Sequence, residues 1–288
     1  VVRLVLEAPL VQIGPLPKNR HAQAGQLGDE GGHLGAGENI HAQVHAFQHK
    51  QGAGPVQSEA MILSADPPAH ALLIDSRSPA EYAQGHLEGA INLDLSGFRG
   101  RLRSEEELEQ LEQALADLNG RIGAGPHRPV VVYDMGLNTR LTKTAFMLAL
   151  GGLEVYLWPQ GWESRATQQA PAQPVAGEPW ARLNREILLT ADEILAGLPY
   201  PLLDVREPHE FATARIPGAK NIPLGAFGLD NAGALGLLPG QAVGVHCRSG
   251  ARSASAFWLL RQQGVQARNY LGSMLEWEAE ADLPVERS

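Results

Sequence analysis

The sequence predicts an α/β protein of two tandem domains, each a mainly parallel sheet with helices on both faces. Strand-like and helix-like segments alternate along the chain, which is the pattern of parallel sheets connected by helices. One segment occurs twice, because residues 72–94 and 201–223 share 9 identities in 23 positions without a gap. A repeat of that length at one offset indicates a duplicated unit. The 288 residues are enough for two domains of ordinary size.

Residues 1–60 differ in composition from the rest of the chain. They contain one aromatic residue, nine glycines and five of the ten histidines. Such a segment can bury little apolar surface, so we predict that it is disordered, or that it is spurious and Met61 is the natural start. His41, His45 and His49 would share one helix face, but chance in a histidine-rich stretch is the favoured interpretation. No metal site is therefore predicted.

The first domain is predicted over residues 61–165. Its opening strand is the apolar run 71–74. A helix start follows, with Ser78 as N-cap and Glu81 at the third helical position, which together form a capping box. The later elements follow from charge, apolar runs and glycine stops, and we expect a helix over 104–118, a buried strand over 130–133 and a helix over about 139–150.

Residues 166–186 are predicted as a linker, because Gln, Pro and Ala dominate them. The second domain is predicted over residues 187–288, and Thr190 and Glu193 form another capping box near its start. The remaining elements are again read from apolar runs and glycine stops, and we expect a strand over 202–205, a strand over 243–245 and a helix from about Ser253 to Gln263, ended by Gly264.

The only cysteine of the chain, Cys247, stands between an apolar strand and the next helix. Ligand sites of open α/β sheets form at such strand ends. The N–H groups of the turn favour an anion, and Arg248 and Arg252 add positive charge. These effects stabilise a thiolate. We therefore predict a reactive nucleophile, and not the small buried hydrophobe that most free cysteines are.

Three motifs occur in a fixed order along the chain. They are Asp-x-Arg-x-Pro-x-Glu, then Gly-Ala-x-Asn, and in the second copy Cys-Arg-Ser-Gly-Ala-Arg. In this order and spacing they resemble the rhodanese (sulfurtransferase) family, from about residue 62 to the C-terminus. Two copies resemble the tandem-domain thiosulfate and 3-mercaptopyruvate sulfurtransferases. The resemblance implies two rhodanese-like domains, no cofactor, and a persulfide formed on Cys247.

The sulfur donor is expected to bind in the loop after Cys247, where N–H groups can stabilise the terminal sulfur. Arg206 has two interpretations. The resemblance implies that it contacts the anionic donor, whereas a pair with Asp204 would make it an anchor for loops. The predicted substrate-binding residues are Arg206, Arg248, Ser249, Gly250, Ala251 and Arg252.

The first domain is predicted to be catalytically silent, because Asp134 takes the position of Cys247. A carboxylate cannot accept sulfur as a persulfide and would repel an anionic donor. Asp134 is expected to satisfy backbone donors at its turn. Arg77, the counterpart of Arg206, is expected to be structural. So is His246, whose side chain should point to the face of the strand opposite Cys247.

Three other functions compete with thiosulfate sulfurtransferase. A phosphatase or arsenate reductase needs five residues between cysteine and arginine, but four separate Cys247 from Arg252, which suits a single sulfur better than an oxyanion. A carrier would pass its persulfide to a partner protein without turnover. A 3-mercaptopyruvate sulfurtransferase is the third, although two loop cations fit dianionic thiosulfate better. The expected acceptor is cyanide, a thiol or a thioredoxin-like protein.

Composition excludes several classes of partner. The net charge of −9 argues against a broad nucleic-acid surface. No apolar run has the length of a membrane span, so no membrane partner is predicted. One cysteine excludes an internal disulfide framework, which fits a reducing compartment, and we predict a cytoplasmic protein.

Overall fold

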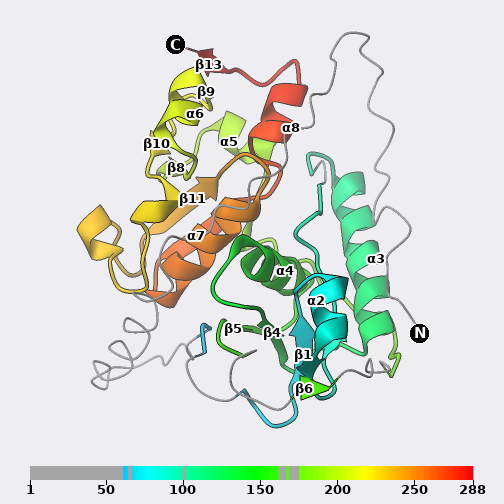
Figure 1. Cartoon of the computed structure of the whole chain (residues 1–288). Helices are drawn as coiled ribbons and strands as arrows, with labels where there is room; N and C mark the ends of the chain where they lie inside the picture. Colours follow the sequence, from blue (N-terminus) through cyan, green and yellow to red (C-terminus); the bar gives the residue numbers. More distant parts are fainter. Residues whose placement is uncertain (1–60, 64–66, 100–101, 162–166, 169–174, 288) are drawn as a thin grey trace.

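The computed structural model describes residues 61–63, 67–99, 102–161, 167–168 and 175–287. The predictions for residues 1–60 and their three histidines lie outside this part. Two parallel sheets organise the described chain, and Figure 1 shows the strands of the first in cyan to green and those of the second in yellow to orange. The predicted fold class is confirmed.

The first sheet has four strands in the order β3-β1-β4-β5, and all neighbours run parallel. Its strands are β1 (Leu72–Asp75), β3 (Ile91–Asn92), β4 (Val130–Tyr133) and β5 (Val155–Trp158), and the helices of this domain are α2 (Pro79–Gln84), α3 (Glu105–Ile122) and α4 (Thr139–Leu150). The capping box of Ser78 and Glu81 is confirmed. α3 runs beyond its predicted end, because Gly123 supplies the left-handed stop at φ 67°.

The second sheet has five strands in the order β10-β8-β11-β12-β7, again all parallel. Its strands are β7 (Leu188–Leu189), β8 (Leu202–Asp204), β10 (Lys220–Asn221), β11 (Ala242–His246) and β12 (Gln266–Tyr270). Its helices are α5 (Ala191–Ala196), α6 (Pro208–Thr213), α7 (Ala251–Gln262) and α8 (Ser273–Ala279), with 3-10 turns η1 (Leu224–Ala226) and η2 (Gly233–Leu235). The capping box of Thr190 and Glu193 is confirmed.

The predicted start of α7 at Ser253 is wrong. The helix begins at Ala251, and its N-cap is Gly250 in the left-handed conformation, without a side-chain cap. The prediction took the start of this helix from the apolar pattern, and a glycine that turns the chain directly into a helix leaves no capping side chain ahead of that pattern. Arg252 therefore belongs to the first turn of α7 and not to the loop.

Two short antiparallel pairs complete the described fold. β2 (His86–Leu87) pairs with β6 (Thr167–Gln168), and β9 (Ala214–Arg215) pairs with β13 (Glu286–Arg287). β6 lies within the predicted linker. Further along the same segment, Gly177 donates its N–H to the Gly120 carbonyl, and the Trp180 carbonyl accepts from the Asn119 side chain. The described parts of this segment are thus attached to the first domain.

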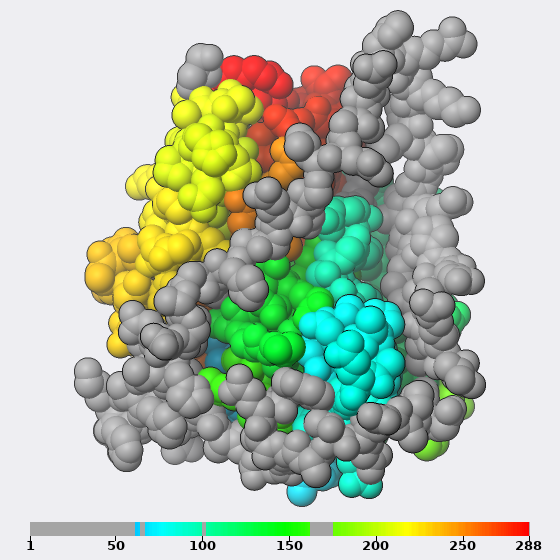
Figure 2. All heavy atoms as spheres, in the orientation of Figure 1, coloured from blue at the N-terminus to red at the C-terminus, as the bar shows by residue number. Residues whose placement is uncertain are grey.

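Both faces of each sheet are buried, as parallel sheets require. Consecutive residues of β4 point to opposite faces of the sheet, and Val132 and Tyr133 accordingly belong to different apolar clusters. One of these clusters continues from the first sheet through α4 and α7 into the second sheet. The rings of Phe146 in α4 and Phe257 in α7 pack edge to face, with their centroids 5.1 Å apart. In the space-filling view, the green atoms of the first domain lie beside the yellow and orange atoms of the second (Figure 2).

Candidate functional site

Cys247 follows β11 and precedes α7, at the carboxyl end of the parallel strands. Its side chain is 1% exposed and belongs to the core that both domains share. Burial alone would fit a small structural hydrophobe. Whether the thiol ionises therefore depends on the polar groups around Sγ.

Those polar groups favour the thiolate. Burial has the largest single effect on the Cys247 pKa and would raise it, but the charge of Arg252 acts in the opposite direction. Hydrogen bonding from the hydroxyl and the N–H of Ser253 and from the N–H of Ser249 also lowers the pKa. The Ser253 hydroxyl donates to Sγ over 3.6 Å. Together these groups lower the pKa of Cys247 below its ordinary value, as the sequence predicted.

The loop around Cys247 is held from outside by the segment that begins α8. The Cys247 carbonyl accepts from Met274 N–H at 3.1 Å, and the Arg248 carbonyl accepts from Leu275 N–H at 2.9 Å. The Cys247 N–H donates to Ser273 Oγ at 3.1 Å. Ser273 is the one described non-glycine residue with positive φ, at 54°. Its left-handed backbone and its hydroxyl both serve to fix the loop.

Gly250 closes the loop. Its φ of 82° favours glycine, and a Cβ there would overlap the carbonyl oxygen of Leu271. The loop can therefore reach α7 only because this residue has no side chain. Ser249, with 8% exposure, and Gly250 are buried, and Ala251 is half-buried.

Arg248 and Arg252 differ in environment. Arg252 makes two charge-assisted hydrogen bonds to Glu210, with nitrogen–oxygen distances of 2.6 and 2.9 Å, and the pair is mostly buried. Arg248 is exposed to solvent. Arg252 is thus the fixed cation beside Sγ, whereas Arg248 faces solvent. The predicted donor contacts of both stay predictions.

Arg206 is bound within the protein. Its guanidinium donates to both carboxylate oxygens of Asp204, the shortest contact being 2.6 Å, and to the Ala214 carbonyl at 2.6 Å. The residue is 4% exposed. This geometry matches the interpretation of Arg206 as a loop anchor, and contact with a donor stays a prediction. Arg77 makes the corresponding pair with Asp75 in the first domain, as expected of a structural residue.

His246 is fully buried, and burial lowers its pKa to about 4. Its Nε2 lies 3.7 Å from Asp204 Oδ2, too far for a hydrogen bond. Asp204 is the partner of His246 on the adjacent strand β8. Asp204 lies on the same face of the sheet as Leu202, opposite to the apolar core that contains Cys247. His246 is therefore neutral at pH 7 and faces away from Sγ, as predicted.

Asp134 occupies the corresponding place in the first domain. It accepts from Met135 N–H at 2.7 Å, which confirms the predicted bond to a backbone donor. The sequence did not predict the bidentate pair with Arg140, at 2.8 Å for each bond, or the bond from the Ser76 hydroxyl at 2.7 Å. Burial would raise the pKa of Asp134, but these bonds outweigh it and lower the pKa.

Several residues that shape the site were not predicted from the sequence. Glu210 stands in the first motif, which gave no hint that it binds Arg252. Ser273 reads as an ordinary turn residue, since positive φ at serine has no sequence signal. Lys143 of α4 reads as the polar face of a helix, yet it is fully buried.

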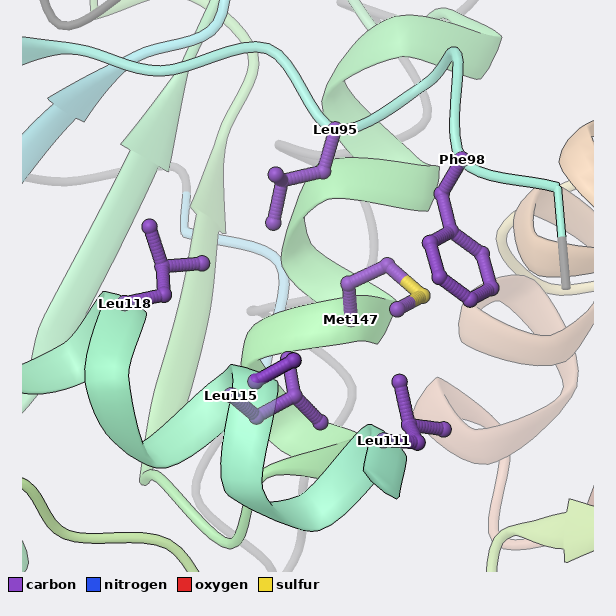
Figure 3. Close-up of a pocket in the computed structure, with 7 residues that line it drawn as sticks. Leu95, Phe98, Leu111, Leu115, Leu118 and Met147 are labelled. Carbon is purple, nitrogen blue, oxygen red and sulfur yellow. The ribbon is translucent and has the colours of Figure 1, made fainter. Parts of the chain in front are cut away.

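The described residues outside this loop offer little other chemistry. They contain no group of three or more His, Cys, Asp or Glu placed to hold a metal. None of their helices combines the length and the apolar character needed to cross a membrane. A pocket between α3 and α4 is entirely apolar (Figure 3), and its lining residues are Leu95, Phe98, Leu111, Ala114, Leu115, Leu118 and Met147.

Comparison with known proteins identifies the domain type. The rhodanese-like domain matches twice, over residues 57–167 and 190–280. The chain is 27% identical over 245 residues to a thiosulfate sulfurtransferase of Azotobacter vinelandii, covering 75% of this chain and 90% of that protein. A putative thiosulfate sulfurtransferase of Mycobacterium tuberculosis is 29% identical over 244 residues, with coverages of 72% and 85%.

Solved structures extend the likeness to three dimensions. The crystal structure of a probable thiosulfate sulfurtransferase is 48% identical, with a TM-score of 0.70, and the match covers 77% of this chain and all of that one. A 3-mercaptopyruvate sulfotransferase of Escherichia coli has a TM-score of 0.59 at 20% identity, over 71% of this chain and 93% of that one. At that identity the second likeness shows the fold alone.

Proposed function

Because the chain belongs to the rhodanese family and carries two copies of its domain, we propose that it is a thiosulfate sulfurtransferase. The sulfane sulfur of thiosulfate would pass through a Cys247 persulfide to a thiophilic acceptor, either cyanide or a thiol. The observation that carries the proposal is the convergence of Arg252, Ser253 and the Ser249 N–H on one buried sulfur. Two relatives and a 48% identical structure bear the name of this activity.

The reaction has two displacements. The Cys247 thiolate attacks the outer sulfur of thiosulfate, a new S–S bond forms, and sulfite leaves with the electron pair of the old bond. The acceptor then attacks the outer sulfur of the persulfide. With cyanide, thiocyanate leaves and the thiolate returns. No proton moves in this cycle, so no general base is required, and neutral His246 is consistent with that.

The site residues divide into three roles in this proposal. Arg252 and the N–H groups of the loop hold negative charge on the cysteine sulfur and on the outer sulfur of the persulfide. Arg248, exposed to solvent, attracts the dianionic donor. Arg206, bound to Asp204, anchors the loops that carry the site.

One observation favours 3-mercaptopyruvate as the alternative donor. Glu210 compensates the charge of Arg252, so the site is less cationic than its sequence suggests. A singly charged donor such as 3-mercaptopyruvate then binds at a smaller electrostatic disadvantage relative to thiosulfate.

The burial of Cys247, at 1% exposure, favours small acceptors over a thioredoxin-like protein or a carrier role.

A donor panel tests the proposal. Thiosulfate and 3-mercaptopyruvate are compared with cyanide as acceptor, and the intact mass is measured after each donor alone. Thiosulfate should add one sulfur atom and give the higher kcat/KM. Arg248→Gly should lower kcat/KM for thiosulfate by about tenfold and shift preference toward 3-mercaptopyruvate. A sulfur adduct without turnover would indicate a carrier, and no adduct from either donor would overturn the proposal.

A further inference from the structure

A lysine of the silent domain contacts the loop of the catalytic one. Lys143 lies in α4 and is fully buried, which is rare for lysine. Its Nζ donates to the Phe98 carbonyl at 2.7 Å within its own domain and to the Ser249 carbonyl at 2.9 Å across the interface. Ser249 is the second residue after Cys247.

This contact determines the direction of a peptide group. In a planar trans peptide, the C=O and the following N–H point to opposite sides. The Arg248 carbonyl is bound to Leu275 N–H, and the next N–H, that of Ser249, accordingly points to Sγ. Lys143 holds the Ser249 carbonyl in the same way, so the N–H of Gly250 is turned away from the first domain. Within the described part of the chain this N–H meets no acceptor.

The contact has no reciprocal partner in the duplicated fold. α4 and α7 both have 12 residues, and aligning their first residues places Ser255 opposite Lys143. The Ser255 hydroxyl forms a hydrogen bond with the hydroxyl of Thr142, at 2.7 Å. A buried cation thus extends from the silent domain to the catalytic loop, and the catalytic domain returns a small hydroxyl.

We propose that Lys143 is a positioning residue for sulfur transfer. Its ammonium fixes the Ser249 carbonyl and thereby the orientation of the Ser249–Gly250 peptide group, which adjoins the peptide whose N–H interacts with the sulfur of Cys247. The inference rests on the proposed function of Cys247. It gives the silent domain a defined part in the chemistry, which it performs without touching the donor.

The test uses the single cysteine of the full-length protein. The rate of alkylation by iodoacetamide, measured against pH, reports the pKa and reactivity of Cys247 alone. Lys143→Met removes the charge and the donors but keeps an unbranched side chain. Thr142→Val is the matched control, because it removes an interdomain hydrogen bond from the same helix without touching the loop. Melting temperature, kcat and KM are measured for each.

Lys143→Met should raise the pKa of Cys247 and lower kcat about tenfold, with little change in KM. Thr142→Val should lower the melting temperature but leave the alkylation profile and kcat unchanged. If Lys143→Met does not fold, Lys143→Gln keeps one N–H donor and should give a smaller shift in the same direction. An alkylation profile and kcat within about twofold of the parent protein would overturn the proposal and leave Lys143 as an interface residue.

The alkylation profile also separates this inference from the proposed function. If the parent protein takes no sulfur from any donor, the proposed function fails, and the pKa of Cys247 in the Lys143 variants still decides whether the lysine orders the loop.

Discussion

The loops that follow β4 and β11 share an arrangement of charged groups but differ in the side chain at the centre. Each loop leads into a helix whose first turn carries an arginine. That arginine binds the glutamate of the Asp-x-Arg-x-Pro-x-Glu motif in its own domain, Arg140 to Glu81 and Arg252 to Glu210. In the first loop the anion at the centre is the carboxylate of Asp134, which is part of the protein. In the second, the sulfur of Cys247 takes that place, and its pKa lies below the ordinary value.

The comparison shows that an anion cradle, meaning the arginine, hydroxyl and backbone N–H groups around the central side chain, can surround either a carboxylate or a thiol. The first loop uses the cradle for stability, because its carboxylate is permanently matched by Arg140, Ser76 and Met135. In the second loop the corresponding group is the sulfur of Cys247, to which the Ser253 hydroxyl donates over 3.6 Å and whose pKa is lowered by the charge of Arg252. Five residues lie between Asp134 and Arg140 but four between Cys247 and Arg252, so the second loop is also the tighter one.

The largest expected effect comes from exchanging the central groups. Cys247→Ser should reduce turnover to background and abolish the sulfur adduct, because an alkoxide is not available at neutral pH. Adding Asp134→Cys to that variant should restore neither, since the first loop is longer and its other groups are arranged for a carboxylate. Intact mass and cyanide-dependent turnover measure both outcomes. Turnover by the double variant would show that the two loops are chemically equivalent.

The two arginines should then give different losses. Arg252→Gln removes the charge that lowers the pKa of Cys247, so the acid limb of the kcat/KM profile should move to higher pH. At neutral pH, kcat/KM for thiosulfate should fall about tenfold to a hundredfold. Arg140→Gln is the control in the loop that follows β4 and should leave that profile in place. Equal profiles for both variants would contradict the division of roles.

Arg140→Gln should instead cost stability. Asp134 is fully buried, and a buried carboxylate that loses its partner costs about 3 kcal/mol of unfolding free energy. The effect has a defined pH window. Because the folded pKa of Asp134 lies below its ordinary value of 3.8, the stabilisation is present above that pH and is lost as pH falls through the folded pKa.

Denaturant unfolding at pH 7 and at about pH 3 checks the sign of that effect. The stability difference between Arg140→Gln and the parent protein should be large at pH 7 and smaller in acid, where Asp134 takes up a proton. A difference that does not change with pH would show that Arg140 acts through packing and not through its charge.

The helix starts after the two loops give the smallest contrast. Gly250→Ala puts a side chain at φ 82° against the Leu271 carbonyl, and should cost about 1–3 kcal/mol of stability together with activity. Asn138→Ala removes an ordinary side-chain cap from α4, and should cost about 1 kcal/mol with turnover unchanged. Thermal unfolding and turnover compare the pair. An active Gly250→Ala enzyme would mean that the loop tolerates another route into α7.

The sequence predicted those elements whose signals are local. β4 and α4 have their predicted bounds, because a continuous apolar run and a glycine stop mark their ends. α7 was placed too late because Gly250 caps it through backbone conformation, which leaves no polar side chain to recognise. α3 was ended too early because Asn119 and Gly120 are poor helix formers, yet both are buried within the helix, which runs on to Ile122.

The site divides along the same line. Cys247 and Arg252 lie close together in the sequence, so their meeting could be predicted. The contacts of Glu210, Ser273 and Lys143 with that loop join distant segments, and Lys143 belongs to another domain. Which helix of one domain meets which helix of the other depends on packing between complete sheets. No local pattern encodes it.

The apolar cluster that runs through α4 and α7 makes the two copies inseparable as folding units. A duplicated gene commonly leaves modules that can be cut apart, yet severing this chain between its sheets would expose Phe146 and Phe257 to water and unpair the Trp258 indole from the Thr142 carbonyl. A heat-capacity scan should therefore show one cooperative transition. The first domain thus supplies part of the core on which the domain that carries Cys247 is packed.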